Sequence, residues 1–114
     1  MAQNVFLDII AGKIPCDKVY EDDDVFAFRD LNPAAPTHVL IVPKKPIATI
    51  NDLTDDDAIV VGRMLLAAKK IAAAEGLSER GYRTVFNCNA DAGQTVFQIH
   101  LHLLGGREMT WPPG

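Results

Sequence analysis

Residues 96–104 constrain this chain more than any other segment, because polar and apolar side chains alternate along them. Successive side chains of an extended strand project to opposite faces, so a period of two assigns each residue to a face. The apolar side chains that would enter a core are Ile99, Leu101 and Leu103. The polar ones that would line the other face are Gln98, His100 and His102. We therefore predict a strand over Val96–Leu104 with one buried and one functional face.

Three interpretations of this polar face fit the residues. The first is an ordinary solvated face. The second is a zinc site, in which His100 and His102 bind the ion together with His38 and a water molecule. The third is direct catalysis, because an imidazole with an ordinary pKa of about 6.5 is neutral and nucleophilic at pH 7. A neighbouring imidazolium would then protonate the leaving group.

The preceding segment, Asn87–Thr95, favours the third interpretation. It combines small, amide and hydroxyl residues, and Gly93 permits backbone geometry that other residues avoid. Gln94, Thr95 and adjacent backbone N–H groups can surround an anion. Donors of this kind around a nucleophilic histidine suit attack on phosphorus, where the non-bridging oxygens carry the charge. Carboxylates are scarce here, which disfavours a metal centre.

The remaining pattern predicts an α+β fold, with a mostly antiparallel five-stranded sheet and its helices on one face. A short helix is expected over Val5–Ile10, and a long helix from near Thr54 to a stop at Gly76. The expected strands are Val19–Tyr20, Val25–Phe28, His38–Pro43, Gly81–Asn87 and Val96–Leu104.

Length and composition exclude several classes of protein. A chain of 114 residues predicts one domain, spanning residues 1–114. Its apolar runs reach only about five residues, far short of the roughly 20 of a membrane span. A formal net charge of −4 offers no basic face for nucleic acid. Cys16 and Cys88 form no metal-binding spacing, and the first residues resemble no signal peptide, so we expect a cytoplasmic protein with free thiols.

Several segments of the chain resemble those of a known family. The run Phe97–Leu104 resembles the histidine-triad signature, in which three histidines alternate with apolar residues and two apolar residues follow. Further segments match the family in order and spacing: Ile9–Pro15, Val25–Pro33, Ala35–Lys44 and Ala92–Val96. The tail Gly105–Gly114 is similar to that of the Hint branch, the histidine-triad nucleotide-binding proteins.

The resemblance implies a function and an assembly. Hint proteins are homodimers whose two sheets join into one larger sheet, and they bind purine nucleotides such as AMP and GMP. They hydrolyse nucleoside 5′-phosphoramidates and related aminoacyl-adenylates without a metal or other cofactor. The reaction passes through a covalent nucleotidyl-histidine, which suits a leaving amine that departs only when protonated.

The resemblance also implies roles for individual residues. His100 corresponds to the nucleophile, His102 to the histidine near the scissile phosphate, and His38 to the upstream histidine that supports the triad. Asp30 matches the carboxylate that accepts from the ribose hydroxyls. The residues that match the purine pocket are Leu31, Val5 and Phe6. Those that match contacts to ribose and phosphate are Asn87, Gly93, Gln94 and Thr95. Trp111 matches the tryptophan that reaches the partner subunit's site.

One position departs from the family pattern, because Gln98 stands where the first histidine usually lies. Glutamine donates and accepts hydrogen bonds but does not titrate. We expect Gln98 to act by orientation, through a bond to His38 or to a backbone group. The departure also keeps a second class open, a nucleotide sensor or protein-interaction module without turnover. A dinucleoside polyphosphate hydrolase is a further alternative within the family.

Overall fold

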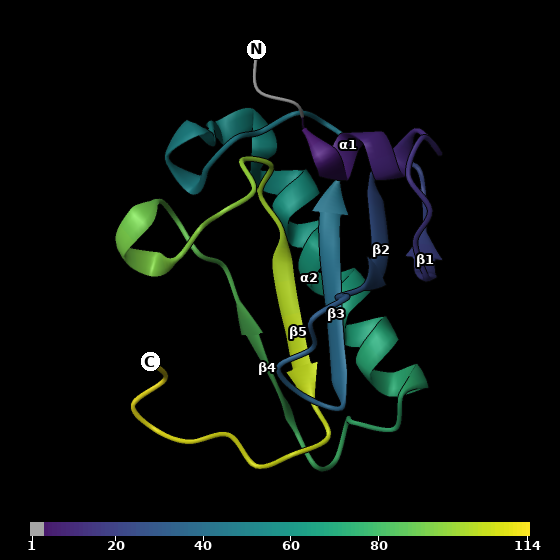
Figure 1. Ribbon diagram of the computed structural model, residues 1–114, viewed down its shortest axis with the longest axis vertical. Helices are drawn as coiled ribbons and strands as arrows, with labels where there is room; N and C mark the ends of the chain where they lie inside the picture. The colour runs from purple at the N-terminus through teal and green to yellow at the C-terminus, as the bar shows by residue number, and fades with distance from the viewer. Residues whose placement is uncertain (1–3) are drawn as a thin grey trace.

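A five-stranded antiparallel sheet organises residues 4–114, which the computed structural model describes (Figure 1). Its strand order is β1-β2-β3-β5-β4, and every neighbouring pair is antiparallel. The strands are β1 (Lys18–Glu21), β2 (Val25–Arg29), β3 (Thr37–Pro43), β4 (Tyr82–Val85) and β5 (Leu101–Gly105). The predicted α+β class with an antiparallel five-stranded sheet is confirmed, although β4 is shorter than the strand expected over Gly81–Asn87.

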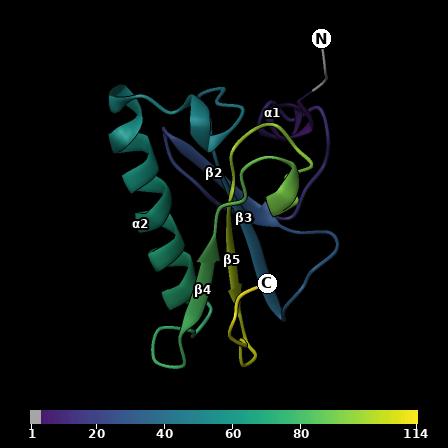
Figure 2. The ribbon, with the colours of Figure 1, turned by 90° about the vertical axis from the view of Figure 1, so that its left-hand side faces the viewer.

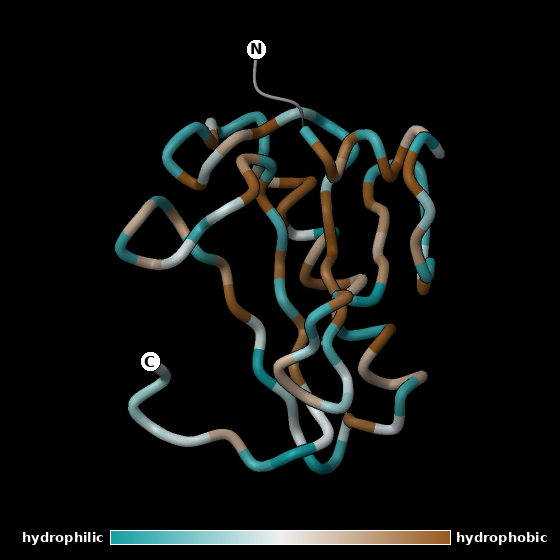
Figure 3. Tube along the Cα trace, in the orientation of Figure 1, coloured by the Kyte–Doolittle hydropathy of each residue, from teal (hydrophilic) through white to brown (hydrophobic). Residues whose placement is uncertain are grey.

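The two helices pack on opposite faces of the sheet, so the expectation that they share one face is wrong. The short helix α1 (Val5–Ile10) and the long helix α2 (Ala58–Ala74) lie on either side of it (Figure 2). The central strands explain this arrangement, because they are apolar at both parities (Figure 3). The strand side chains buried with α2 are Val25, Ala27, Val39, Ile41, Leu101 and Leu103. Those buried beside α1 are Phe26, Phe28, Leu40 and Val42.

Local chemistry sets both ends of α2. A turn of 3₁₀-helix over Asp55–Asp57 precedes it, and the carboxylate of Asp57 accepts from the backbone N–H of Thr54 at 2.9 Å. This reciprocal arrangement is a capping box, and it agrees with the helix start expected near Thr54. At the other end Gly76 has φ +75°, and the N–H of Leu77 bonds the carbonyl of Ala72 at 2.9 Å. That left-handed turn ends the helix where the sequence places its stop. No helix in the described part of the chain is long and apolar enough to cross a membrane.

The strand predicted over Val96–Leu104 is correct only in its second half. The β5 ladder begins at Leu101, and residues 96–100 lie outside it. The reason lies in the neighbouring strand, since β5 pairs with β3 only from Thr37 to Ile41. Beyond that point the Gln98 side chain, rather than a strand backbone, bonds the carbonyl of Pro43. The alternation of polar and apolar residues gives no sign of this change of hydrogen-bond partner.

Candidate active site

A pocket of about 380 Å³ lies beside α1, on the face of the sheet opposite α2. Its apolar wall consists of Val5, Phe6, Ile9, Ile14, Pro15, Cys16, Phe28, Leu31, Leu40 and Val96. Its polar residues are Arg29, Asp30, Asn32, Thr95, His100 and His102. An apolar cavity with a few polar groups at one side is the usual form of a small-molecule site. His100 and His102 thus line a pocket whose wall is mostly apolar.

The imidazole of His100 is held in one tautomer by the backbone. Its Nδ1 lies 2.8 Å from the carbonyl oxygen of Gln98. A carbonyl oxygen only accepts, so Nδ1 carries the proton and Nε2 keeps its lone pair. The ring of Phe6 packs edge-on against the imidazole, with centroids 4.9 Å apart and an interplanar angle of 87°. These contacts fix both the plane of His100 and the nitrogen that is free to react.

A second hydrogen-bond chain joins His38 on β3 to His102 on β5. The backbone N–H of Ala34 donates to Nδ1 of His38 at 3.0 Å, so the proton of the neutral ring sits on Nε2. That Nε2 lies 2.9 Å from Nδ1 of His102 and donates to it. The proton of neutral His102 must then sit on its Nε2. One peptide group thus sets the tautomers of two imidazoles in sequence.

Nε2 of His102 is buried and has no hydrogen-bond partner within residues 4–114. Leaving a buried N–H unpaired costs about 1–3 kcal/mol. The residue lines the pocket, so an acceptor on a bound ligand would remove this cost. The site therefore offers one lone pair, on His100, beside one unused donor, on His102, and their ring centroids lie 4.9 Å apart.

All three imidazoles are neutral at pH 7. Burial lowers the pKa of His100 and the pKa of His38 below the ordinary value for histidine. Burial lowers the pKa of His102 to about 4, and the positive charges that His100 and His38 acquire when they are themselves protonated add to this shift. The carboxylate of Asp30 opposes this shift at each ring but does not overcome it. A neutral imidazole is the form that attacks as a nucleophile.

The groups that could bind a metal differ from the three histidines proposed from the sequence. Asp30, His38 and His102 bring ligand atoms within 4.8 Å of one another, whereas His100 is not part of this cluster. A histidine that binds a metal normally donates its other N–H to an acceptor. Nδ1 of His38 instead accepts from Ala34, which leaves the proton on the nitrogen nearest the cluster. This hydrogen bond disfavours zinc at His38.

The pocket brings together about half of the residues expected to form the site. Those that line it are Val5, Phe6, Asp30, Leu31, Thr95, His100 and His102. His38 joins them through its bond to His102. Those that do not line it are Asn87, Gly93, Gln94, Gln98 and Trp111. Gly93 has φ +83°, as its predicted unusual geometry requires. Trp111 is 81% exposed and lies under the guanidinium of Arg83.

The two glutamines act on the backbone rather than on the pocket. Gln94 accepts from the N–H of Asn89 and donates to the carbonyls of Ala48 and Val96, so it braces its own loop. Gln98 is fully buried, and its amide bonds backbone groups of the segment that follows β3. The expectation that Gln98 bonds His38 or a backbone group is thus met by its second alternative.

Several pocket residues were missed from the sequence alone. Phe28 and Leu40 lie on strands that are apolar at both parities, which is the signal that could have revealed a second buried face. Ile14, Pro15 and Cys16 follow α1 without any periodic pattern. Only the path of the chain brings them to the pocket wall, and no local pattern in the sequence reports it.

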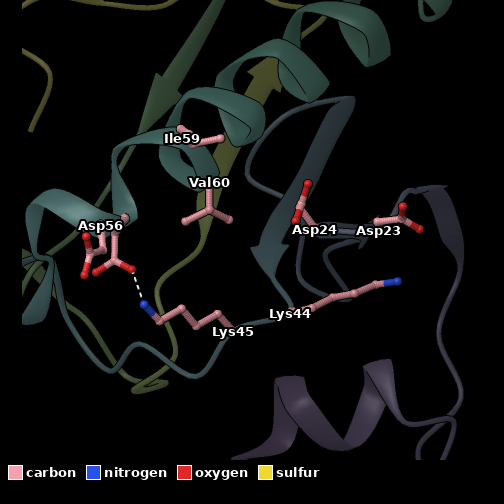
Figure 4. Close-up of a pocket in the computed structure, with 8 residues that line it drawn as sticks. Asp23, Asp24, Lys44, Lys45, Asp56, Ile59 and Val60 are labelled. Atoms are coloured by element: carbon pink, nitrogen blue, oxygen red, sulfur yellow. Dashed lines mark hydrogen bonds and ion pairs between the residues drawn. The ribbon is translucent and has the colours of Figure 1, made fainter.

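A separate concavity of about 300 Å³ holds none of this chemistry (Figure 4). Aspartates, two lysines and the start of α2 surround it, and Lys45 forms an ion pair with Asp57 across it (Figure 4). No histidine lines this concavity. Both of its lysines already form ion pairs with carboxylates of the chain, so we place the active site at the pocket beside α1.

Comparison with known proteins identifies the family to which the chain is similar. The model of the HIT domain matches residues 11–109. The chain is 53% identical over 110 residues to an uncharacterised HIT-like protein of Synechococcus elongatus, covering 96% of each. It is 50% identical over 107 residues to the purine nucleoside phosphoramidase of Escherichia coli K12, covering 94% of this chain and 90% of that one. The crystal structure of a HIT family hydrolase from Legionella pneumophila superposes with a TM-score of 0.96 at 60% identity, covering 98% of this chain and all of the other.

The depressed pKa of His102 makes stability depend on pH. Below about pH 6.5 an unfolded imidazole takes up a proton, whereas folded His102 does so only near pH 4. The contribution of His102 to the free energy of unfolding is therefore complete above about pH 6.5 and is lost as the pH falls toward 4. Urea titrations at about pH 7.5 and about pH 4.5 should show that His102→Gln removes about 2 kcal/mol of the acid-induced loss. Equal acid-induced losses in variant and wild type would contradict this assignment.

Proposed function

The chain belongs to the HIT family, and we propose that it hydrolyses purine nucleoside 5′-phosphoramidates to release the nucleoside monophosphate. The observation that carries this proposal is the pair of fixed tautomers in the pocket. Nε2 of His100 has a free lone pair, and Nε2 of His102 has an unused N–H. The relative named purine nucleoside phosphoramidase supports the choice of substrate. We treat residues 1–114 as a single HIT domain.

His100 is the nucleophile of the proposed reaction. Its Nε2 attacks the α-phosphorus, a new N–P bond forms, and the electron pair of the old P–N bond leaves with the amine. Phosphoryl transfer is catalysed mainly by positioning and by donors to the charged oxygens. The carbonyl of Gln98 holds Nδ1–H of His100 throughout, so positive charge on the nucleotidyl-imidazolium is stabilised by a hydrogen bond.

His102 handles the protons. A bound phosphate beside its Nε2 favours the imidazolium, so substrate binding raises the pKa of His102 from its low value and lets the ring take a proton from solvent. The solvent proton enters at Nδ1 of His102, where the hydrogen bond from His38 gives way. The Nε2–H of the imidazolium then passes to the leaving nitrogen, which departs as a neutral amine. The free Nε2 of the now neutral His102 accepts a proton from the water that attacks the nucleotidyl-histidine. The monophosphate is released with the electron pair of the N–P bond returned to His100, and the Nδ1 proton of His102 returns to solvent, which restores the bond from His38.

The pocket accounts for recognition of the nucleoside. The purine lies against the apolar wall, which includes Val5, Phe6 and Leu31. Asp30 accepts from the ribose hydroxyls, and its carboxylate is already oriented by the N–H of Asn32 at 2.8 Å. Thr95 lies beside the phosphate. The loop that precedes Thr95 is shaped by Asn87, Gly93 and Gln94. Aminoacyl-adenylates present the same nucleotide and a different leaving group, so we include them as substrates.

The alternatives fit less well. A sensor without turnover rests on Gln98, but this side chain bonds backbone groups and leaves the His100 and His102 nitrogens in place. A dinucleoside polyphosphate hydrolase needs room for a second nucleotide, whereas the pocket of about 380 Å³ suits one. Metal catalysis is disfavoured by the bond from Ala34 to His38.

We also propose a cytoplasmic homodimer whose sheets join through β4. This strand lies at one edge of the sheet formed by residues 4–114. Tyr82, the first residue of β4, is 39% exposed. An exposed aromatic side chain on a free strand edge suits pairing with a second copy. Sedimentation of Tyr82→Asp as a monomer, beside a dimeric wild type and a dimeric Lys18→Asp control at the opposite edge, would support this interface.

The central experiment is hydrolysis of adenosine 5′-phosphoramidate. Wild type should release AMP equally with and without EDTA, because no step uses a metal. His100→Asn lacks the free Nε2 lone pair and should lose at least about a thousandfold in kcat while still binding AMP. AMP release is followed by chromatography and AMP binding by calorimetry. Activity lost to EDTA, or retained in His100→Asn, would contradict the proposed function.

A further inference from the structure

We propose that the side-chain amide of Gln98 positions the nucleophile, because it holds in place the carbonyl that sets the tautomer of His100. The proposal rests on the proposed function, in which His100 attacks phosphorus. The side-chain amide of Gln98 does not line the pocket, and within residues 4–114 it forms no hydrogen bond to a histidine. It therefore acts on the reaction through the backbone carbonyl of Gln98, which bonds His100. It is therefore a positioning residue rather than a catalytic one.

Residues 96–100 lie outside the β5 ladder, so no strand pairing fixes the carbonyl of Gln98. The segment is nevertheless buried, with Gln98 at 0% and Ile99 at 2% exposure. One backbone bond, from the N–H of Ile99 to the carbonyl of Ile47 at 2.8 Å, holds it on one side. Gln94 donates to the carbonyl of Val96 at the start of the segment, and the side chain of Gln98 supplies the hydrogen bonds at Gln98 itself.

The amide of Gln98 uses its full hydrogen-bonding capacity. Its Oε1 accepts from the N–H of Ile47 at 3.0 Å and from Nδ2 of Asn4 at 3.2 Å. Its Nε2 donates to the carbonyls of Pro43 and Lys45 at 3.0 and 2.8 Å. An amide offers two donors on nitrogen and two lone pairs on oxygen, so every group is used. Gln98 thereby continues the sheet past the end of β3 by means of a side chain.

Asn4 extends this network to the wall of the pocket. Its Oδ1 accepts from the N–H of Leu7 at 3.2 Å and caps α1, while its Nδ2 bonds Gln98. The first turn of α1 carries Phe6, whose ring packs edge-on against His100. His100 is thus restrained from two directions, by the Gln98 carbonyl and by Phe6. Both restraints depend on the side-chain amide of Gln98.

An imidazole at position 98 cannot make these bonds. A neutral histidine has one donor and one acceptor, and its cation has two donors and no acceptor. At least two of the groups now bonded to Gln98 would lose their partners in a fully buried place. In this chain the glutamine is therefore the better support for the nucleophile. The departure from three histidines changes how His100 is held rather than whether it reacts.

The test is a graded series at position 98. Gln98→Met has a similar shape and none of the hydrogen bonds, so kcat for adenosine 5′-phosphoramidate should fall about tenfold to a hundredfold with KM nearly unchanged. Gln98→His keeps a donor and an acceptor, so its kcat should fall by less than about tenfold. We expect kcat to decrease in the order wild type, Gln98→His, Gln98→Met. Equal kcat values across folded variants would overturn the proposal.

A second readout separates positioning from loss of stability. Nitrogen-15 spectra of labelled histidine report which ring nitrogen of His100 carries the proton. Wild type should show the Nδ1–H form, and Gln98→Met a mixture of both tautomers. Thr49→Val removes the hydrogen bonds of another buried polar side chain, one that bonds neither His100 nor residues 96–100, and it should leave the His100 spectrum unchanged. An unaltered tautomer in folded Gln98→Met would overturn the proposal.

Asn4→Ser keeps the test decisive if Gln98→Met does not fold. Serine is a good N-cap, so α1 retains its cap while the donor to Gln98 is lost. A fall in kcat with partial Nε2–H character at His100 supports the proposal, and wild-type values for both overturn it. The spectra need no turnover. If the wild type releases no nucleotide, the proposed function fails while these spectra still decide the role of Gln98.

Discussion

The pairing of β3 with β5 is the constraint on which the site depends. Leu40 faces His102 across the ladder, and His38 faces Leu104, so the two histidines are diagonal neighbours on one face. At this spacing their rings reach each other, and a hydrogen bond of 2.9 Å joins them. A slip of one residue would turn His102 toward α2 and place Leu101 or Leu103 in the pocket. The buried apolar row on the other face prevents that slip, because Leu101 and Leu103 are almost fully enclosed.

Backbone groups, rather than side-chain acids, prepare the imidazoles for reaction. The N–H of Ala34 determines the proton position on His38, and through it the position on His102. The carbonyl of Gln98 determines the proton position on His100. Peptide groups do not titrate near neutral pH, so these tautomers are held over a wide pH range. Burial lowers the pKa of each ring, which favours the neutral form of His100, the proposed nucleophile.

Patterns in the sequence predicted most of the sheet and about half of the pocket. Alternation identified the faces of Leu101, His102 and Leu103, and the capping residues located α2. Alternation failed at Gln98, because it records side-chain parity but not the loss of a strand partner. It also failed to show that the helices lie on opposite faces, although β2 and β3 are apolar at both parities. The wall formed by Ile14 and Cys16 depends on the path of a loop, and only tertiary structure shows it.

The most direct test of the account is the stereochemical course at phosphorus. A substrate made chiral at the α-phosphorus with sulfur and oxygen isotopes would be hydrolysed in labelled water, and the configuration of the nucleotide product determined. Attack by His100 followed by attack of water inverts the centre twice, so a nucleotidyl-histidine intermediate predicts overall retention. Overall inversion would show a single displacement by water. That result would contradict a nucleotidyl-histidine and leave the fixed tautomer of His100 without its proposed purpose.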